Sequence, residues 1–447
     1  MDPQGEKERA GPSLRWQSIR GSFWTVMGHG GGQALRFASN LIMTRLLFPE
    51  AFGIMSLVQV VLQGLEMFSD IGAGPSVIRS KAGKDPRFLN TAWTIQVIRG
   101  AGLWGASILL AWPAARLYGV PDLRWMIPAT GFAALVGGLG SPANFLLRKE
   151  INLKPLVIRD MLSQAAGIAF MIFFALFFHR SAWALVAGGL VRGTTQTVLS
   201  YQLLPQVHPR LCWNREAAKE ILGFGRWILV STALSYVLQQ SDRAVLGGMI
   251  SPAELGVYTM ATYLVMAPIN VLTPLTLNVL FPACSSLANN APARLYSRLF
   301  QARAAIHAFM LPLFCILAIW GQQVVDLLYD PRYAGAGWML RILAVGAIGR
   351  VVGTTGQIAM LALGDSLRYM FLQIVRCVLL VGGMLIGFHY WGLPGFVVGV
   401  TLPRFLDYPA LVWAVRPHKV WQPGLDAASL IASAVVILGG CFLTGGL

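Results

Sequence analysis

The sequence predicts an all-α polytopic membrane protein, built from two six-helix bundles and at least one additional carboxy-terminal helix. Of its 447 residues, 55% are hydrophobic and only 12% are charged, whereas about 25% of a soluble domain is charged. The mean hydropathy is +0.61. Apolar stretches of about 20 residues, the length that crosses a bilayer, recur along the whole chain.

Thirteen apolar stretches lie between polar or proline-marked breaks, and we expect each to form a transmembrane helix. They cover residues 21–47, 52–74, 88–113, 122–145, 156–178, 182–204, 221–249, 254–280, 302–328, 335–362, 367–391, 393–415 and 427–446. The polar start of the chain has no short apolar run with a cleavage site, so no removable signal peptide is expected. The expected units are a cytoplasmic segment (1–20), an amino-terminal bundle (21–210), a carboxy-terminal bundle (211–415), and a linker with a further helix (416–447).

The basic residues of the loops are distributed unequally. With the amino terminus inside, 20 lysines and arginines fall in inner segments and only four in outer loops, namely Arg116, Arg124, Arg180 and Arg332. Because cytoplasmic loops carry the excess of lysine and arginine, this bias predicts a cytoplasmic amino terminus. It also accounts for the net charge of +16 through anionic membrane lipids, so no nucleic-acid partner is expected.

The two predicted bundles carry a repeated turn. Leu47–Gly53 reads LFPEAFG and Ile250–Gly256 reads ISPAELG, with proline and glycine at a constant offset of 203 positions. Because each half contains six helices, both halves start on the same side of the membrane. The repeat is therefore parallel, and we expect the bundles to be related by a pseudo-two-fold axis along the membrane normal, with the substrate site between them.

The stretch around the first turn is similar to a known family. Gly21–Trp24, Arg36–Gly53 (RFASNLIMTRLLFPEAFG) and Phe68–Gly72 (FSDIG) resemble the opening of bacterial polysaccharide-export flippases. These form the oligosaccharide-flippase branch of the multidrug/oligosaccharidyl-lipid/polysaccharide exporter superfamily. The match is dense over about 60 residues and diffuse afterwards. Members often have fourteen spans, whereas this chain has thirteen predicted ones.

The resemblance implies two bundles around a cavity that opens alternately to each side of the bacterial inner membrane. It implies an oligosaccharide on an undecaprenyl-pyrophosphate carrier as substrate, moved for O-antigen, capsule or exopolysaccharide synthesis. Membrane lipids, a polysaccharide polymerase and export proteins are the implied partners. The chain is therefore expected to be a transporter and not an enzyme.

The basic residues that remain after the 24 assigned to loops all fall inside predicted spans, and every one is arginine. The eleven are Arg36, Arg45, Arg99, Arg159, Arg192, Arg226, Arg243, Arg341, Arg350, Arg376 and Arg404. Facing lipid, they would together cost on the order of 30 kcal/mol, well above an ordinary net stability of 5–15 kcal/mol. The carboxylates available to pair with them are fewer; Glu66, Asp70, Asp160, Asp242, Asp326 and Asp407 lie within spans or at their ends. The sequence therefore predicts a wet, cationic cavity for an anionic substrate.

We expect five of these arginines to bind the pyrophosphate, because a guanidinium pairs bidentately with phosphate oxygens and stays charged. They are Arg36, Arg99, Arg243, Arg350 and Arg376. Four neutral side chains on the same helix stripes are candidates for sugar contacts, with hydrogen bonding between helices as the alternative. They are Gln33, Asn40, Gln63 and Gln357. The pairs Arg159/Asp160, Asp242/Arg243 and Arg404/Asp407 are close enough in sequence to neutralise each other.

Glu66 and Asp70 are candidates for ion coupling. A carboxylate in a membrane span can exchange a proton or hold a sodium ion as the cavity changes sides. Alternatively, the two carboxylates pair with nearby arginines. The sequence leaves both interpretations open.

Other motifs and functions are disfavoured. Gly100–Gly105 matches GxGxxG, but it lies in a predicted span with no strand before it, and Gly28–Gly32 lacks the lysine of a P-loop. Five cysteines without a CxxC pattern indicate neither disulfides nor zinc, so no cofactor is expected. A drug or cation exporter of the same superfamily would need excess acid in its spans. A glycan polymerase or ligase would need a large outer loop, which the sequence lacks.

Overall fold

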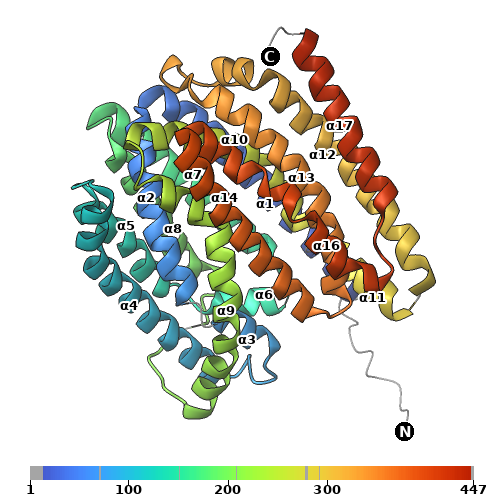
Figure 1. Cartoon of the computed structure of the whole chain (residues 1–447). Coiled ribbons are helices and arrows are strands. Elements are labelled where there is room, and N and C mark those ends of the chain that lie inside the picture. The colour runs from blue at the N-terminus through green and yellow to red at the C-terminus, as the bar shows by residue number, and fades with distance from the viewer. Residues whose placement is uncertain are drawn as a thin grey trace.

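The structure is a computed structural model, and it describes residues 14–69, 72–150, 152–207, 209–276, 280–290 and 292–443. Within these ranges every regular element is helical. The long helices run side by side in two bundles, as Figure 1 shows, so the predicted fold class is confirmed.

The amino-terminal bundle contains six long helices. They are α1 (Leu14–Leu46), α2 (Pro49–Phe68), α4 (Pro86–Tyr118), α5 (Leu123–Gly138), α7 (Lys154–Phe177) and α8 (Ala182–Leu203). The short helices α3 (Ala73–Arg79) and α6 (Ala143–Lys149) follow α2 and α5, and α6 is bent by 65° from α5. The predicted span 122–145 therefore ran past the end of α5 into α6, whereas Pro49–Arg79 counts as one candidate span.

The carboxy-terminal bundle repeats this plan. Its helices are α9 (Arg215–Leu246), α10 (Pro252–Leu275), α11 (Phe281–Asn290), α12 (Pro292–Leu328), α13 (Ala336–Ala362), α14 (Ser366–Thr401), α15 (Pro403–Leu406) and α16 (Tyr408–Val415). Helix α14 is a hairpin, because Trp391 and Gly392 leave the helical conformation and Gly392 has φ 59°. The legs of the hairpin touch closely where Gly387 meets Gly395. This break separates the predicted spans 367–391 and 393–415.

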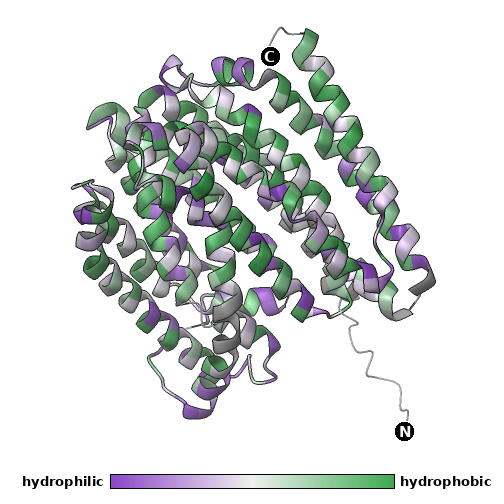
Figure 2. Ribbon diagram, in the orientation of Figure 1, coloured by the Kyte–Doolittle hydropathy of each residue, from purple (hydrophilic) through white to green (hydrophobic). Residues whose placement is uncertain are grey.

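Figure 2 shows that hydrophobic residues predominate along the long helices. By length and composition, eight helices of the described part are apolar enough to cross a membrane, or nine if the bent pair α5 and α6 is one span. The number of apolar helices is lower than the thirteen predicted spans for two reasons. The segment 366–418 counts once although it folds back at Gly392, and α1, α8 and α9 are not among the apolar helices. Polar and charged side chains interrupt these three helices.

The repeated turns of the two bundles meet each other. The glycine of one turn contacts the proline of the other, so that Gly53 touches Pro252 and Gly256 touches Pro49. Exchanging the bundles turns one contact into the other, which places the pseudo-two-fold axis between the two turns. Among the described residues, the most extensive packing between the bundles is that of α2 against α10. We call this end of the molecule the turn end.

Two tyrosines after α12 add hydrogen bonds across the turn end. The hydroxyl of Tyr333 donates to the carbonyl oxygen of Leu47 at 3.0 Å. The hydroxyl of Tyr329 donates to Oδ1 of Asn40 at 2.9 Å. Both bonds join the carboxy-terminal bundle to the end of α1, so the bundles are held together at the turn end.

The last long helix, α17 (Pro423–Leu443), is fixed by a buried polar network. Arg303 on α12 is 1% exposed and forms an ion pair of 2.5 Å with Asp426 on α17. His307 hydrogen-bonds Ser429 at 2.8 Å and Thr355 at 3.2 Å. Because removing one member of a buried ion pair leaves an uncompensated charge, this network ties α17 firmly to the carboxy-terminal bundle. Figure 1 shows α17 beside α12 at the edge of that bundle.

Candidate functional site

A cavity of about 840 Å³ lies between the two bundles. Helices α1 and α2 line it from the amino-terminal bundle, and α9, α10, α13, α14 and α15 line it from the carboxy-terminal bundle. Its lining holds five arginines and two aspartates among the described residues: Arg36, Arg243, Arg350, Arg376, Arg404, Asp242 and Asp407. The larger cavity therefore has a surplus of positive charge.

A second cavity of about 390 Å³ adjoins the first, and the two share three lining residues, Arg36, Arg243 and Tyr263. It lies mainly among α1, α2, α7, α8 and α10. Arg192 on α8 is its third arginine, and no carboxylate occurs among its described lining residues. The smaller cavity is thus the more strongly cationic of the two for its size.

One arginine of the larger cavity has a carboxylate partner. The Nε of Arg376 donates to Oδ2 of Asp407, and its Nη1 donates to Gln357 and, at 3.2 Å, to Gln373. Sequence proximity had predicted that Asp407 pairs with Arg404, three residues away. No ion pair forms between Asp407 and Arg404, because the carboxylate of Asp407 pairs with Arg376 on α14 instead.

The remaining carboxylate of the larger cavity, Asp242, is held by neutral donors. It accepts hydrogen bonds of 2.8 Å from the hydroxyl of Tyr258 and from the backbone amide of Arg243. The predicted neutralisation of the Arg243 guanidinium by Asp242 is therefore not observed. By contrast, the predicted pair of Arg159 and Asp160 is confirmed at 2.5 Å.

Five cavity arginines form no ion pair with a carboxylate within the described ranges. Arg192 and Arg404 make no hydrogen bond or ion pair there. Arg350 donates only to Sδ of Met266 at 3.4 Å, a weak acceptor. Arg36 donates to Oε1 of Gln33 at 3.1 and 2.8 Å. Nε of Arg243 is buried without a hydrogen-bond partner. These guanidinium groups are available to an anionic ligand.

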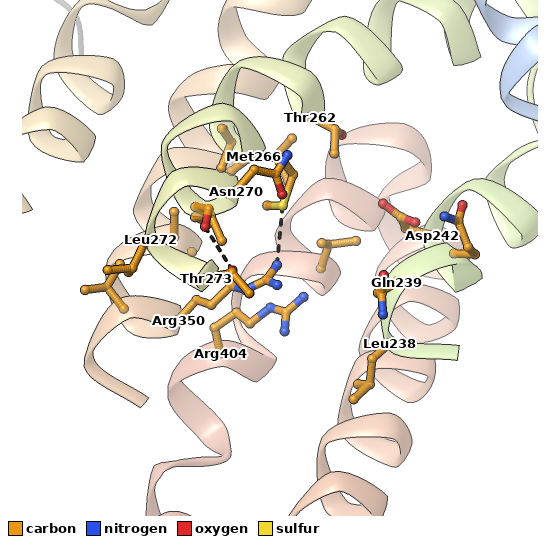
Figure 3. A pocket seen from close by; sticks show the side chains of 18 of the residues that line it. Leu238, Gln239, Asp242, Thr262, Met266, Asn270, Leu272, Thr273, Arg350 and Arg404 are labelled. Atoms are coloured by element: carbon orange, nitrogen blue, oxygen red, sulfur yellow. Dashed lines mark hydrogen bonds between the residues drawn. The ribbon is translucent and has the colours of Figure 1, made fainter. Parts of the chain in front are cut away.

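Figure 3 shows how the larger cavity presents two of these groups. Arg350 from α13 and Arg404 from α15 lie beside each other, and Asp242 lies across the pocket from them. Two adjacent guanidinium groups repel each other unless a negative charge lies between them. This arrangement suits a ligand with two or more negative charges, such as a diphosphate.

The neutral candidates line the cavities, but some are occupied by protein contacts. Gln33 and Gln357 accept hydrogen bonds from arginines, and Gln63 accepts one from Gln240 across the bundle interface. Asn40 lines the smaller cavity and also bonds to Tyr329 at the turn end. These contacts order the lining. They fit the alternative of hydrogen bonding between helices as well as a role in sugar binding.

The structure places Arg99 away from both cavities. Its guanidinium donates to the carbonyl oxygens of Ser69 and Glu66 at 2.9 and 2.8 Å. These carbonyls lie at the end of α2 and lack partners within that helix, so Arg99 caps it. We therefore leave Arg99 out of the binding site proposed below.

Of the two ion-coupling candidates, Glu66 also lies outside the cavity linings. Glu66 is exposed on α2 and is not among the lining residues of either cavity. Arg99 contacts its backbone carbonyl, not its carboxylate. Asp70 lies outside the described residues. Arg192 and Arg404, which line the cavities, were recognised from the sequence as arginines inside spans, Arg404 as a possible partner of Asp407, but they were not chosen as site residues.

A two-bundle membrane fold with a charged chamber between its halves is the architecture of a secondary transporter. Comparison with known proteins agrees with this class. Residues 42–336, more than half of the chain, match a family described as polysaccharide biosynthesis protein. The chain belongs to this family.

Individual proteins show the same relationship. The lipopolysaccharide biosynthesis protein WzxC of Escherichia coli (strain K12) is 21% identical over 397 residues, covering 88% of this chain and 80% of that protein. The structure of the lipid II flippase MurJ in an inward closed conformation superposes with a TM-score of 0.71 at 12% identity, covering 95% of this chain and 93% of MurJ. An inward-facing transporter of the multidrug resistance MATE family gives a TM-score of 0.67 at 17% identity, covering 87% and 94% of the two chains. The chain thus shares the fold of this transporter superfamily.

Proposed function

We propose that this protein is a flippase, which moves a lipid-linked oligosaccharide on an undecaprenyl-pyrophosphate carrier from the cytoplasmic to the outer leaflet of the bacterial inner membrane. The transport serves the synthesis of a surface polysaccharide. The family and the similarity to WzxC support a role in polysaccharide biosynthesis. The likeness to MurJ supports a fold that can accommodate such a cargo.

The observation that carries this proposal is the surplus of unpartnered arginine in the chamber between the bundles. Arg350 and Arg404 are the proposed diphosphate ligands, because they lie side by side and neither forms an ion pair or hydrogen bond with a carboxylate in the described structure. Arg376 positions Gln357 and Asp407 instead of binding cargo freely. A cation exporter with the same fold would require the opposite charge balance in its cavity.

The packing of the bundles supports alternating access. The bundles are closed at the turn end, where Gly53 and Gly256 contact the opposite turn. With the amino terminus in the cytoplasm, as the loop charges predict, the turn end is the outer end. The cavities then receive cargo from the cytoplasmic leaflet and release it after the turn end opens. A polymerase that consumes the delivered units is the proposed partner.

The experiment removes charge from the proposed diphosphate site. In proteoliposomes that contain an undecaprenyl-pyrophosphate-linked oligosaccharide, the double variant Arg350→Gln/Arg404→Gln is expected to lower the flipping rate at least tenfold. The matched control is Arg124→Gln, which removes an exposed arginine at the start of α5. Equal flipping by the double variant, the control and the wild-type protein would refute the function proposed for this chamber.

A further inference from the structure

The smaller cavity has positive charges of its own, which a diphosphate bound at Arg350 and Arg404 in the larger cavity would not neutralise. Arg192 lines only the smaller cavity, whereas Arg350 and Arg404 line only the larger one. Arg36 and Arg243 stand at the boundary and face both. A ligand held by Arg350 and Arg404 alone would leave three guanidinium groups in and beside the smaller cavity without a counter-charge.

Several polar groups of the smaller cavity also lack partners. Nε of Arg243 and the hydroxyl of Tyr263 are buried and make no hydrogen bond within the described structure. Gln59 is exposed on α2 and makes no hydrogen bond there either. Buried donors without acceptors are costly, so these groups indicate a ligand with several oxygen atoms. The neutral groups suit sugar hydroxyls, but the three arginines require a negative charge as well.

The size of the smaller cavity limits what that ligand can be. Its volume of about 390 Å³ lies at the lower end of the range of 300–1,000 Å³ for small-molecule sites. It can take one or two sugar rings but not a long chain. A carboxylate on a sugar ring offers two oxygens to a guanidinium fork, in the geometry that favours arginine over lysine.

We propose that the smaller cavity binds a carboxylate-bearing sugar of the cargo, so that the transported oligosaccharide is acidic. This inference rests on the proposed function, because it assigns the two cavities to two parts of one lipid-linked molecule. Arg350 and Arg404 hold the diphosphate in the larger cavity. Arg192, with Arg36 and Arg243 at the boundary, holds a sugar carboxylate in the smaller one.

The test measures the two binding sites separately in the full-length protein in nanodiscs. The probes are a disaccharide that ends in glucuronic acid, its glucose counterpart, and undecaprenyl pyrophosphate. Wild-type protein is expected to bind the acidic disaccharide at least tenfold more tightly than the neutral one. Arg192→Gln should abolish this preference and leave undecaprenyl-pyrophosphate affinity unchanged, whereas Arg404→Gln should do the reverse. Arg192→Lys, which keeps the charge, should retain part of the preference.

Each other result has a defined meaning. Equal binding of the two disaccharides by wild-type protein would overturn the acidic-cargo inference, while intact diphosphate binding would leave the flippase proposal standing. A preference that persists in Arg192→Gln would overturn the assignment to the smaller cavity. Equal loss of both ligands in Arg192→Gln would show that the cavities form one site. Failure of wild-type protein to bind undecaprenyl pyrophosphate would overturn the proposed function itself.

Discussion

The contact between the repeated turns gives the most direct test of how the bundles separate. A Cβ atom on Gly53 would lie 1.8 Å from the carbonyl oxygen of Pro252, and one on Gly256 would lie 1.9 Å from that of Pro49. Ordinary contact begins at about 3.4 Å, so an alanine at Gly53 requires the turns to part by about 1.6 Å. The variant Gly53→Ala therefore disfavours the state in which the turn end is closed.

The size of the effect follows from the cost of overpacking. Added methyl groups in well-packed interiors typically cost about 1–3 kcal/mol, and that free energy corresponds to a shift of about 5- to 150-fold in a two-state equilibrium. The shift favours the state with an open turn end, because there the added methyl group has room. We expect Gly256→Ala to act in the same direction, since it makes the symmetry-related contact.

Spin-label distances across the turn end measure this equilibrium. Glu50 and Ala253 are exposed and occupy equivalent positions in the two turns, so labelled cysteines at both sites report the separation. The background should lack the partly exposed Cys212. Gly102→Ala is the matched control, because its Cβ would meet no atom within 4 Å. Distance distributions in Gly53→Ala and Gly256→Ala that match this control would refute the assignment of the turns as a gate.

Three further outcomes are expected. Asp426→Asn should lower the free energy of unfolding by about 3–5 kcal/mol, because it leaves Arg303 buried without its charge partner; the change Arg303→Met/Asp426→Leu should cost less in thermal unfolding, and an equal or larger cost would contradict this. Arg99→Gln should lower the melting temperature without changing undecaprenyl-pyrophosphate affinity; weakened affinity at unchanged stability would return Arg99 to the cargo site. The backbone amide of Arg368 donates to Asp365 in the loop before α14 and lowers the pKa of that carboxyl. Its stabilising contribution is complete above the ordinary pKa of about 3.9 and disappears as the pH falls through the lowered value. Asp365→Asn should therefore flatten the acid side of the stability profile, and an unchanged profile would exclude this contribution.

The helices could be predicted from the sequence because apolar length and loop charge are strong, local signals. The break between the legs of α14 was visible in the sequence at Gly392, which adopts φ 59°. The bend between α5 and α6 was missed. Both helices are apolar, and hydropathy does not indicate a change in the direction of the helix axis. Helices α1 and α9 were recognised as stretches between polar or proline-marked breaks, although their polar residues keep them below an apolar threshold.

The candidate site was predictable in kind but not residue by residue. The cost of burying charge showed that span arginines must face a cavity or a partner. Whether a given arginine faces the cavity or pairs with a carboxylate depends on tertiary contacts, which the sequence does not show. The chain breaks between α14 and α16, so that Asp407 turns toward Arg376 and leaves Arg404 in the cavity. The prediction that Arg404 pairs with Asp407 assumed a continuous helix there, and the ion pair of Asp407 is with Arg376 instead.

The positions of Arg36 and Arg243 connect the gate to the cavities. Both line the boundary between the cavities, but Arg36 belongs to α1 and Arg243 to α9, so they come from opposite bundles. A rocking motion that parts the bundles at the turn end must also move these two guanidinium groups relative to each other. A cargo that spans the boundary is bound best when both arginines reach it, and it loses one of them when the bundles part. Because a ligand shifts a conformational equilibrium only through such differential contacts, the shared arginines are where cargo binding and opening of the turn end are expected to be coupled.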